Sequence, residues 1–355
     1  MKQPLALTGG TGHLGTVLAH TLLAHRNPDR ELVTPQDAAA DASPPGSALR
    51  CVVRSGRRIP GLEEHEATGR LAYHELSLQD LAGLTRAFEG VSTVIHAAGL
   101  VSFMPGRRRE LHRVNVEGTR RALLAAERAG VRRFLYVGSV EAFPLEHADG
   151  PVTEELPLDP GRTVMAYGWS KALAMQEVLG GSPATMERIV CCPTAFLGPP
   201  DYRGSPIGSF VRDTARGRLP VAISGGFDFV DVRDVATGIL AAVERGRDGA
   251  CYLLGGRYVT VPEMVRLVAA EAGVPGPAVT LPLRAVQPFT PLVEGYYALS
   301  GRPPRFTRSS LRLLSLGVRV DTRRAEAELD YHPRPIAETI RDTVAWFSRN
   351  GDINL

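Results

Sequence analysis

The sequence has few cysteines, little net charge and no long apolar run, and each shortage excludes a class of protein. Its four cysteines among 355 residues show no CxxC pair and no ligand-like spacing with histidine, so they predict buried free thiols and no metal site. The net charge of +3 is too small to indicate nucleic acid or an anionic membrane as a partner. No segment reaches the roughly 18 uninterrupted apolar residues of a transmembrane helix, and no basic leader precedes the first apolar run, so we expect a cytoplasmic protein.

Apolar runs that look like strands alternate with longer segments of helical period over the first 196 residues. This alternation predicts an α/β fold with a doubly wound parallel sheet and helices on both faces. The adjacent Cys191 and Cys192 fall on one such run, so their side chains should point to opposite faces of the sheet. Residues 26–48 are rich in Pro, Ala, Asp and Ser without periodicity, which predicts a mobile surface insertion.

After about residue 196 the alternation fails, and Pro and Gly clusters separate isolated amphipathic helices. This pattern is typical of a smaller domain that covers a substrate. Because residues 227–256 resume the earlier pattern, we expect that domain to be discontinuous. The predicted division is a dinucleotide-binding domain of residues 1–196 and about 227–256, and a substrate-binding domain of about 197–226 and 257–355.

The stretch "LTGGTGHLG" places Gly9, Gly12 and Gly15 between the first predicted strand and a helix. One glycine permits the tight turn, one lets backbone amides approach a pyrophosphate, and one allows close packing of the helix on the sheet. The positive end of the helix dipole would then face the anion. The loop therefore predicts a Rossmann-type domain that binds a dinucleotide.

The residue that ends the second strand should distinguish the two nicotinamide dinucleotides, because an acid there binds the ribose 2′-hydroxyl and an arginine accommodates a 2′-phosphate. If "ALRCVVRSG" is that strand, the position is filled by Arg54, which favours NADP(H). The rival strand is "ELVTPQD", with Asp37 as the acid and NAD(H) as the cofactor. Pro35 interrupts that run and would remove a ladder hydrogen bond from a central strand.

Tyr167 and Lys171 lie four residues apart on a predicted helix, which brings both side chains to one face. A phenol with a pKa of about 10 donates a proton poorly at neutral pH unless a cation lowers that value. We expect Lys171 to supply this cation. Ser139 follows a predicted strand at the carboxyl edge of the sheet, where its hydroxyl could hold a substrate carbonyl.

Over nearly its whole length the chain resembles the extended short-chain dehydrogenase/reductase family. The motifs that carry the resemblance are "TGGTGHLG", "HAAG" at 96–99, "NVEGT" at 115–119, "YVGS" at 136–139, "YGWSK" at 167–171 and "FVDVRDVA" at 229–236. The chain looks most like the subgroup of dihydroflavonol reductase-like enzymes and hopanoid-associated sugar epimerases. The resemblance implies that Tyr167 is the acid/base, that Lys171 also holds the nicotinamide ribose, that Ser139 orients the carbonyl and that Asn115 supports the central strands.

Two departures from the family pattern matter. Glu75 and Leu76 stand where many relatives have Asp-Leu beside the adenine, and Phe227 stands where nucleotide-sugar epimerases carry a diphosphate-binding arginine. The predicted cofactor-binding residues are Thr8, Gly9, Gly12, His13, Leu14, Gly15, Arg54, Glu75, Leu76, Ala97, Ala98, Gly99, Asn115, Tyr167, Lys171, Pro193 and Thr194. The absence of the family's diphosphate-binding arginine at position 227 argues against a nucleoside-diphosphate sugar as the substrate.

The predicted substrate pocket consists mostly of apolar or aromatic residues, namely Val101, Phe103, Glu141, Phe143, Phe196 and Tyr202. Such a lining suits a hydrophobic or aromatic carbonyl or alcohol compound. We therefore predict an NADP(H)-dependent reductase or dehydrogenase of a ketone or aldehyde, with NAD(H) as the alternative cofactor. The alternatives are a sugar epimerase or dehydratase that retains its NAD(P), and a non-catalytic dinucleotide sensor. Family members pair through the helices after "NVEGT" and around "YGWSK", which predicts a homodimer.

Overall fold

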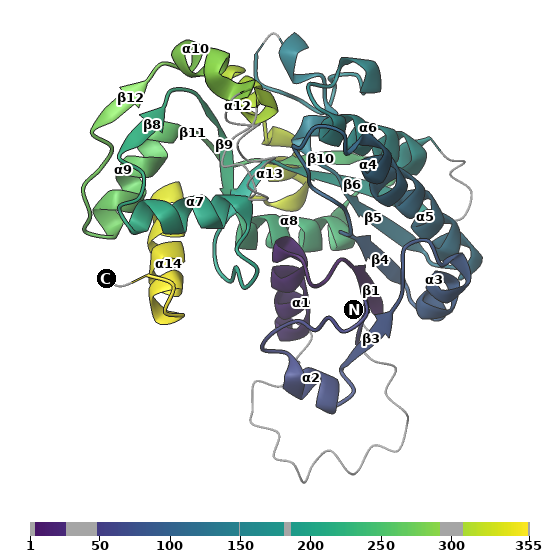
Figure 1. Ribbon diagram of the computed structural model, residues 1–355. Coiled ribbons are helices and arrows are strands. Elements are labelled where there is room, and N and C mark those ends of the chain that lie inside the picture. Colours follow the sequence, from purple (N-terminus) through teal and green to yellow (C-terminus); the bar gives the residue numbers. More distant parts are fainter. Residues whose placement is uncertain (1–3, 26–47, 149, 181–185, 292–307, 354–355) are drawn as a thin grey trace.

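The centre of the molecule is a parallel sheet of seven strands in the order β10-β6-β5-β4-β1-β2-β3 (Figure 1). The computed structural model describes residues 4–25, 48–148, 150–180, 186–291 and 308–353. The strands are β1 (Leu5–Thr8), β2 (Leu49–Val53), β3 (Leu71–Glu75), β4 (Thr93–His96), β5 (Arg133–Val137), β6 (Glu187–Pro193) and β10 (Cys251–Leu254). The predicted α/β, Rossmann-type fold is confirmed.

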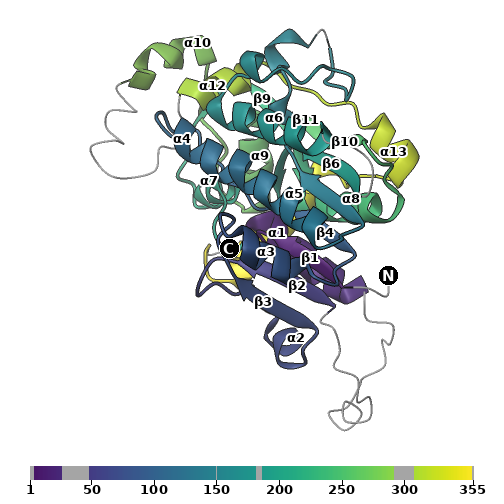
Figure 2. The same cartoon turned by 90° about the vertical axis from the view of Figure 1, so that its right-hand side faces the viewer.

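Helices cover both faces of this sheet (Figures 1 and 2). On one face α1 (His13–His25) packs against α8 (Val232–Arg245), and on the other α5 (Gly118–Arg128) packs against both α3 (Leu81–Phe88) and α6 (Ala166–Leu179). The side chains of successive strand residues alternate between the two faces, because a strand has a period of two. Cys191 accordingly lies in the core under α1 and α8, and Cys192 lies in the opposite core, as predicted.

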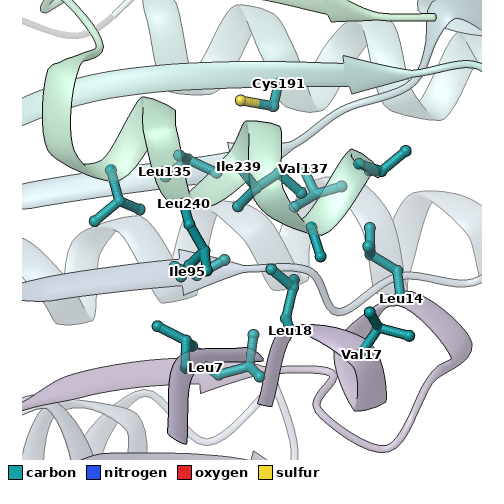
Figure 3. Close-up of a cluster of buried hydrophobic side chains, with 14 of the residues drawn as sticks. Leu7, Leu14, Val17, Leu18, Ile95, Leu135, Val137, Cys191, Ile239 and Leu240 are labelled. Atoms are coloured by element: carbon teal, nitrogen blue, oxygen red, sulfur yellow. The ribbon is translucent and has the colours of Figure 1, made fainter. Parts of the chain in front are cut away.

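Figure 3 shows the core under α1 and α8. Leu7, Ile95 and Leu135 project from three adjacent strands toward Leu18 and Ile239 on the helices, and all five are inaccessible to solvent. Each fully buried aliphatic side chain of this kind contributes roughly 1.5–3 kcal/mol. This packing fixes the start of α1, and therefore the glycine loop, relative to the sheet.

The second part of the structure is built on the three-stranded sheet β11-β9-β7, made of β7 (Ala195–Leu197), β9 (Gly226–Asp231) and β11 (Arg257–Thr260). Around it lie α7 (Pro206–Ala215), α9 (Val261–Glu271) and α14 (Ile336–Arg349), which pack against one another. A short parallel pair joins β8 (Val221–Ile223) to β12 (Val279–Leu281). The shorter helices are α2 (Glu63–Ala67), α4 (Arg108–Leu111), α10 (Leu283–Val286), α12 (Arg308–Ser315) and α13 (Arg323–Leu329).

Two segments depart from the predicted domain division. β9 pairs with β7 and β11 and not with the seven-stranded sheet, so the return to the large sheet begins with α8. Near the C-terminus, α13 packs on α8 and β10, although its residues fall within the predicted substrate-binding domain. Strand pairing decides the placement of β9, and helix packing decides that of α13. A local pattern of apolar residues identifies neither the strands nor the helices that they contact.

The predicted insertion at 26–48 lies almost wholly outside the described residues, as does the rival second strand at 31–37. Within the described residues all four cysteines are buried and unpaired, as predicted. No helix in that part of the chain combines the length and the apolar character needed to cross a membrane.

Candidate functional site

The glycine loop connects β1 to α1, as the sequence predicts. Gly9 has a φ of +75°, and a Cβ atom there would lie 2.6 Å from the backbone of Ala98. A Cβ at Gly15 would lie 2.1 Å from the carbonyl oxygen of Gly9, whereas one at Gly12 would lie 3.3 Å from the same oxygen. Gly9 and Gly15 are therefore required by the folded loop itself, whereas a Cβ at Gly12 would make a tight contact and no severe clash.

A cavity of about 300 Å³ opens beside this loop. Gly12 and His13 bring the N-terminus of α1 to it, and an N-terminus of a helix favours an anion. The full lining is Gly12, His13, Thr16, Gly56, Arg57, Arg58, Pro60, Pro200, Tyr202 and Arg203. The combination of backbone amides with arginine side chains fits the phosphate and adenosine end of a dinucleotide.

The turn after β2 holds the predicted cofactor-specificity residue. β2 is the predicted run, paired with β1 and β3, and the exposed Arg54 follows it directly. Glu75 ends β3, and its carboxylate accepts hydrogen bonds from Ser55 Oγ at 2.9 Å, Gly56 N at 3.1 Å and Arg58 Nη1 at 2.9 Å. The bond from Arg58 is the main reason why the pKa of Glu75 falls to about 2. Glu75 thus shapes the turn that presents the arginines.

The three predicted catalytic residues come from two neighbouring elements. Tyr167 is the second residue of α6, Lys171 lies one turn later, and Ser139 follows the end of β5 by two residues. All three are at least nine-tenths buried. Lys171 Nζ donates to the carbonyl oxygen of Val137 at 2.7 Å and lies 4.7 Å from the ring centre of Tyr136.

Burial governs the ionisation of this group. It lowers the pKa of Lys171 to about 8 and raises the pKa of Tyr167 above its usual value. A nearby charge on Glu141 raises the tyrosine's pKa further, and only the Ser139 hydroxyl acts in the opposite direction. Burial of the phenolate thus dominates the pKa of Tyr167, and the expectation that Lys171 lowers this pKa stays a prediction.

Asn115 ties the start of α6 to the segment after β4. Its amide nitrogen donates to the oxygen of Leu100 at 2.9 Å and to Ser170 Oγ at 2.9 Å, and its side-chain oxygen accepts from Leu100 N at 2.7 Å. Ser170 Oγ in turn donates to the carbonyl oxygen of Tyr167 at 2.7 Å. Asn115 thus holds the start of α6, which carries Tyr167 and Lys171, through hydrogen bonds that satisfy its own buried amide group.

Thr8 and His96 extend this network into the sheet. Thr8 Oγ1 lies 2.7 Å from His96 Nδ1 and accepts from Ala98 N at 3.2 Å, and His96 Nε2 lies 3.1 Å from Thr119 Oγ1. Burial lowers the pKa of His96 to about 3, so the ring is neutral. These contacts give Thr8 and His96 a structural part in the site.

The remaining predicted cofactor residues gather where the strands of the large sheet end, apart from Leu14, which is buried in the first turn of α1. They are Leu76 after β3, Ala97, Ala98 and Gly99 after β4, and Pro193 and Thr194 at the end of β6. Because all seven strands are parallel, their carboxyl ends share one edge, which is where ligands bind in such sheets.

Of the predicted pocket residues, Phe103 and Glu141 contact the predicted catalytic residues. The ring of Phe103 meets that of Tyr167 edge to face, with the ring centres 6.0 Å apart. Glu141 has one buried carboxylate oxygen without a hydrogen-bond partner, and burial raises its pKa to about 8. Val101 is 57% exposed, whereas Phe143 is buried in the core.

Phe196 and Tyr202, two further predicted pocket residues, both lie near the start of α1. The ring of Phe196 lies 5.7 Å from that of His13, and Tyr202 lines the cavity beside the glycine loop. Their role as substrate contacts stays a prediction. Phe227, which replaces the diphosphate-binding arginine, is buried in the core.

Sequence reasoning missed Pro200 and Arg203, which also line the cavity. Neither stands in a recognisable motif. Their place beside the glycine loop, almost 190 residues earlier, follows from the long-range contact of His13 Nε2 with the carbonyl oxygen of Gly198 at 2.8 Å. No local signal in the sequence indicates that contact.

The comparisons with known proteins agree with this geometry. The model of the NAD dependent epimerase/dehydratase family matches residues 5–255. Sterol demethylase protein B of Methylococcus capsulatus is 32% identical over 98% of this chain and 99% of its own, and "Putative dihydroflavonol 4-reductase" of Synechocystis is 28% identical over 99% and 96%. The crystal structure of gox2253 is 30% identical, covers 99% of this chain and all of its own, and superposes with a TM-score of 0.79.

Proposed function

The chain belongs to the NAD dependent epimerase/dehydratase family, and on that premise we propose that it is an NADP(H)-dependent reductase or dehydrogenase. Membership makes it an enzyme of oxidoreductase type that uses a nicotinamide dinucleotide. The proposed substrate is a ketone or aldehyde, or the matching alcohol, on a largely hydrophobic or aromatic small molecule. The observation that carries the proposal is the grouping of the buried Ser139, Tyr167 and Lys171 between the end of β5 and the start of α6, at the carboxyl edge of the large sheet.

A protonated phenol suits the reductive direction, in which the oxygen of the carbonyl gains a proton as its carbon is reduced. A reduced nicotinamide, when bound, supplies the hydride. Tyr167 donates the proton to the substrate oxygen. Ser139 Oγ accepts a hydrogen bond from Glu141 N at 3.2 Å, which leaves its own proton free to donate to the same oxygen.

The uncompensated arginines of the turn after β2 support NADP(H) as the cofactor. Arg54 stands where a dinucleotide-binding sheet meets the adenosine ribose, and Arg57 lines the adjoining cavity. Arginine binds a phosphate monoester through paired, charge-assisted hydrogen bonds, which a free 2′-hydroxyl cannot replace. NAD(H) is the alternative cofactor.

Two features support a hydrophobic substrate. Phe103 lies edge to face with Tyr167, and Phe227 takes the place of an arginine that would hold a sugar nucleotide. The names of the two relatives reported above refer to a sterol and to a dihydroflavonol, which are both polycyclic and largely apolar compounds. We propose that this chain acts on a compound of similar character.

The test follows NADPH absorbance in the presence of a panel of cyclic, aromatic and steroid ketones and aldehydes, after the purified protein has been denatured and its released dinucleotide measured. We expect little retained cofactor, net NADPH consumption with at least one hydrophobic carbonyl, and a higher kcat/KM with NADPH than with NADH. Stoichiometric retained NAD(P) with isomerisation or dehydration of a sugar would favour the epimerase or dehydratase instead. Binding without turnover of any substrate would favour the sensor.

We also propose a homodimer formed through α5 and α6, which lie side by side on one surface (Figure 2). The two helices carry the half-buried apolar side chains Leu124, Trp169 and Leu173. Multi-angle light scattering at micromolar concentration should give twice the chain mass of 38.2 kDa. A monomer at that concentration would contradict the proposal.

A further inference from the structure

Positive charge gathers around the cavity beside the glycine loop, and it comes from two separate parts of the chain. Arg57 and Arg58 line the cavity from the turn after β2, and Arg203 lines it from the loop between β7 and α7. Arg58 is neutralised, because its guanidinium lies 3.1 Å from Glu66 and 2.9 Å from Glu75.

Arg54, Arg57 and Arg203 have no such compensation. No carboxylate within the described segments lies at ion-pair distance from any of the three. Burial, followed by the positive charges of Arg57 and Arg54, lowers the pKa of Arg203. A multiply charged anion placed among the three arginines would offset this repulsion, because each guanidinium group would attract it.

The loop that carries Arg203 is held in place without a ligand. His13 Nε2 contacts the carbonyl oxygen of Gly198 at one end, and the buried carboxylate of Asp201 accepts from Ser205 N at 2.8 and 3.0 Å at the other. Between them the ring of Tyr202 meets that of Trp346 edge to face, with centres 5.5 Å apart. The loop therefore presents Arg203 to the cavity at little further cost in conformational entropy.

We propose that Arg203 binds the 2′-phosphate of NADP(H) together with Arg54 and Arg57, so that two distant segments of the chain determine the choice of cofactor. This inference rests on the proposed use of NADP(H). The pyrophosphate has its own place at the N-terminus of α1, beside Gly12 and His13, where backbone amides are available. Arg54 and Arg57 instead follow the end of β2, where the adenosine ribose of a dinucleotide lies, and Arg203 shares the cavity with Arg57 and lies near enough to both for their charges to act on it.

The experiment measures the dissociation constants of NADP⁺, NAD⁺ and adenosine 2′,5′-bisphosphate by calorimetry with the full chain. Arg203→Ala should weaken NADP⁺ and the bisphosphate by roughly 10- to 100-fold, as for the loss of a charge-assisted hydrogen bond, and change NAD⁺ by less than about twofold. Arg54→Ala should show the same selectivity. Arg203→Lys should recover part of the affinity, because it restores the charge but not the paired donors.

Arg218→Ala is the matched control, since it removes one exposed positive charge from the same part of the molecule, after α7, and should leave all three constants unchanged. Equal weakening of NADP⁺ and NAD⁺ by Arg203→Ala would overturn the proposal, because Arg203 would then contact a group that both cofactors share. A selective effect of Arg54→Ala with none of Arg203→Ala would overturn it too, yet would leave NADP(H) use intact. If the wild-type chain binds NAD⁺ more tightly than NADP⁺, both the role of Arg203 and the proposed use of NADP(H) are refuted.

Discussion

Replacing Tyr167 with phenylalanine should abolish nearly all turnover and leave dinucleotide binding close to that of the wild type. The substitution removes only the hydroxyl group, so the ring can still meet Phe103 edge to face and fill the same buried space. Positioned proton transfer contributes on the order of 10²–10⁴-fold to a rate, and kcat should fall by that factor. Steady-state kinetics with NADPH and the best carbonyl of the panel, together with the NADP⁺ dissociation constant, provide the measurement.

Tyr252→Phe is the control for this substitution, because it also removes a buried tyrosine hydroxyl, one that donates to Glu328 at the far edge of the large sheet. It should cost about 1 kcal/mol of stability and leave kcat unchanged. A Tyr167→Phe enzyme with near-normal kcat would show that another group supplies the proton. Glu141, whose buried carboxyl has a pKa raised to about 8, would then be the next residue to replace.

The sequence predicts the parts of the fold that depend on local pattern. β2 could be placed because a run without proline can pair on both sides, whereas Pro35 would have interrupted pairing of the rival strand. The glycine loop could be placed because its steric requirements are encoded in three residues. The position of β9 could not be predicted, since its apolar residues suit either sheet and only its pairing with β7 and β11 assigns it.

Some residues of the candidate site could likewise be placed from the sequence, and others could not. Ser139, Tyr167 and Lys171 each stand at a fixed offset from a strand end or within one helical turn, so their relation follows from the sequence. Tyr202 and Arg203 reach the cavity beside the glycine loop through the fold of the loop after β7, and no motif in the sequence predicts this fold. The ionisation of Tyr167 depends on its burial, and burial is a property of the whole packed structure.

Substitutions in the glycine loop should give the second large effect, and the structure distinguishes the expected results at Gly12 and Gly15. Gly15→Ala places a Cβ atom 2.1 Å from the backbone oxygen of Gly9, so the loop or α1 must move. Overpacking of this kind costs typically 1–3 kcal/mol, and more where the neighbour is rigid backbone. We expect a lower melting temperature without added cofactor, and loss of dinucleotide binding as well.

Gly12→Ala should instead spare the fold and impair binding alone. Its Cβ would lie 3.3 Å from the oxygen of Gly9, a tight but tolerable contact, and Gly12 lines the cavity whereas Gly15 does not. The added methyl group would occupy the space through which a pyrophosphate approaches the backbone amides, and losing two charge-assisted hydrogen bonds weakens binding by about 100-fold or more. Thermal melting without ligand and calorimetry with NADP⁺ separate the two variants. If Gly12→Ala binds NADP⁺ as tightly as the wild type does, the pyrophosphate does not approach the loop at this residue; if it melts as early as Gly15→Ala, the two glycines share one structural role.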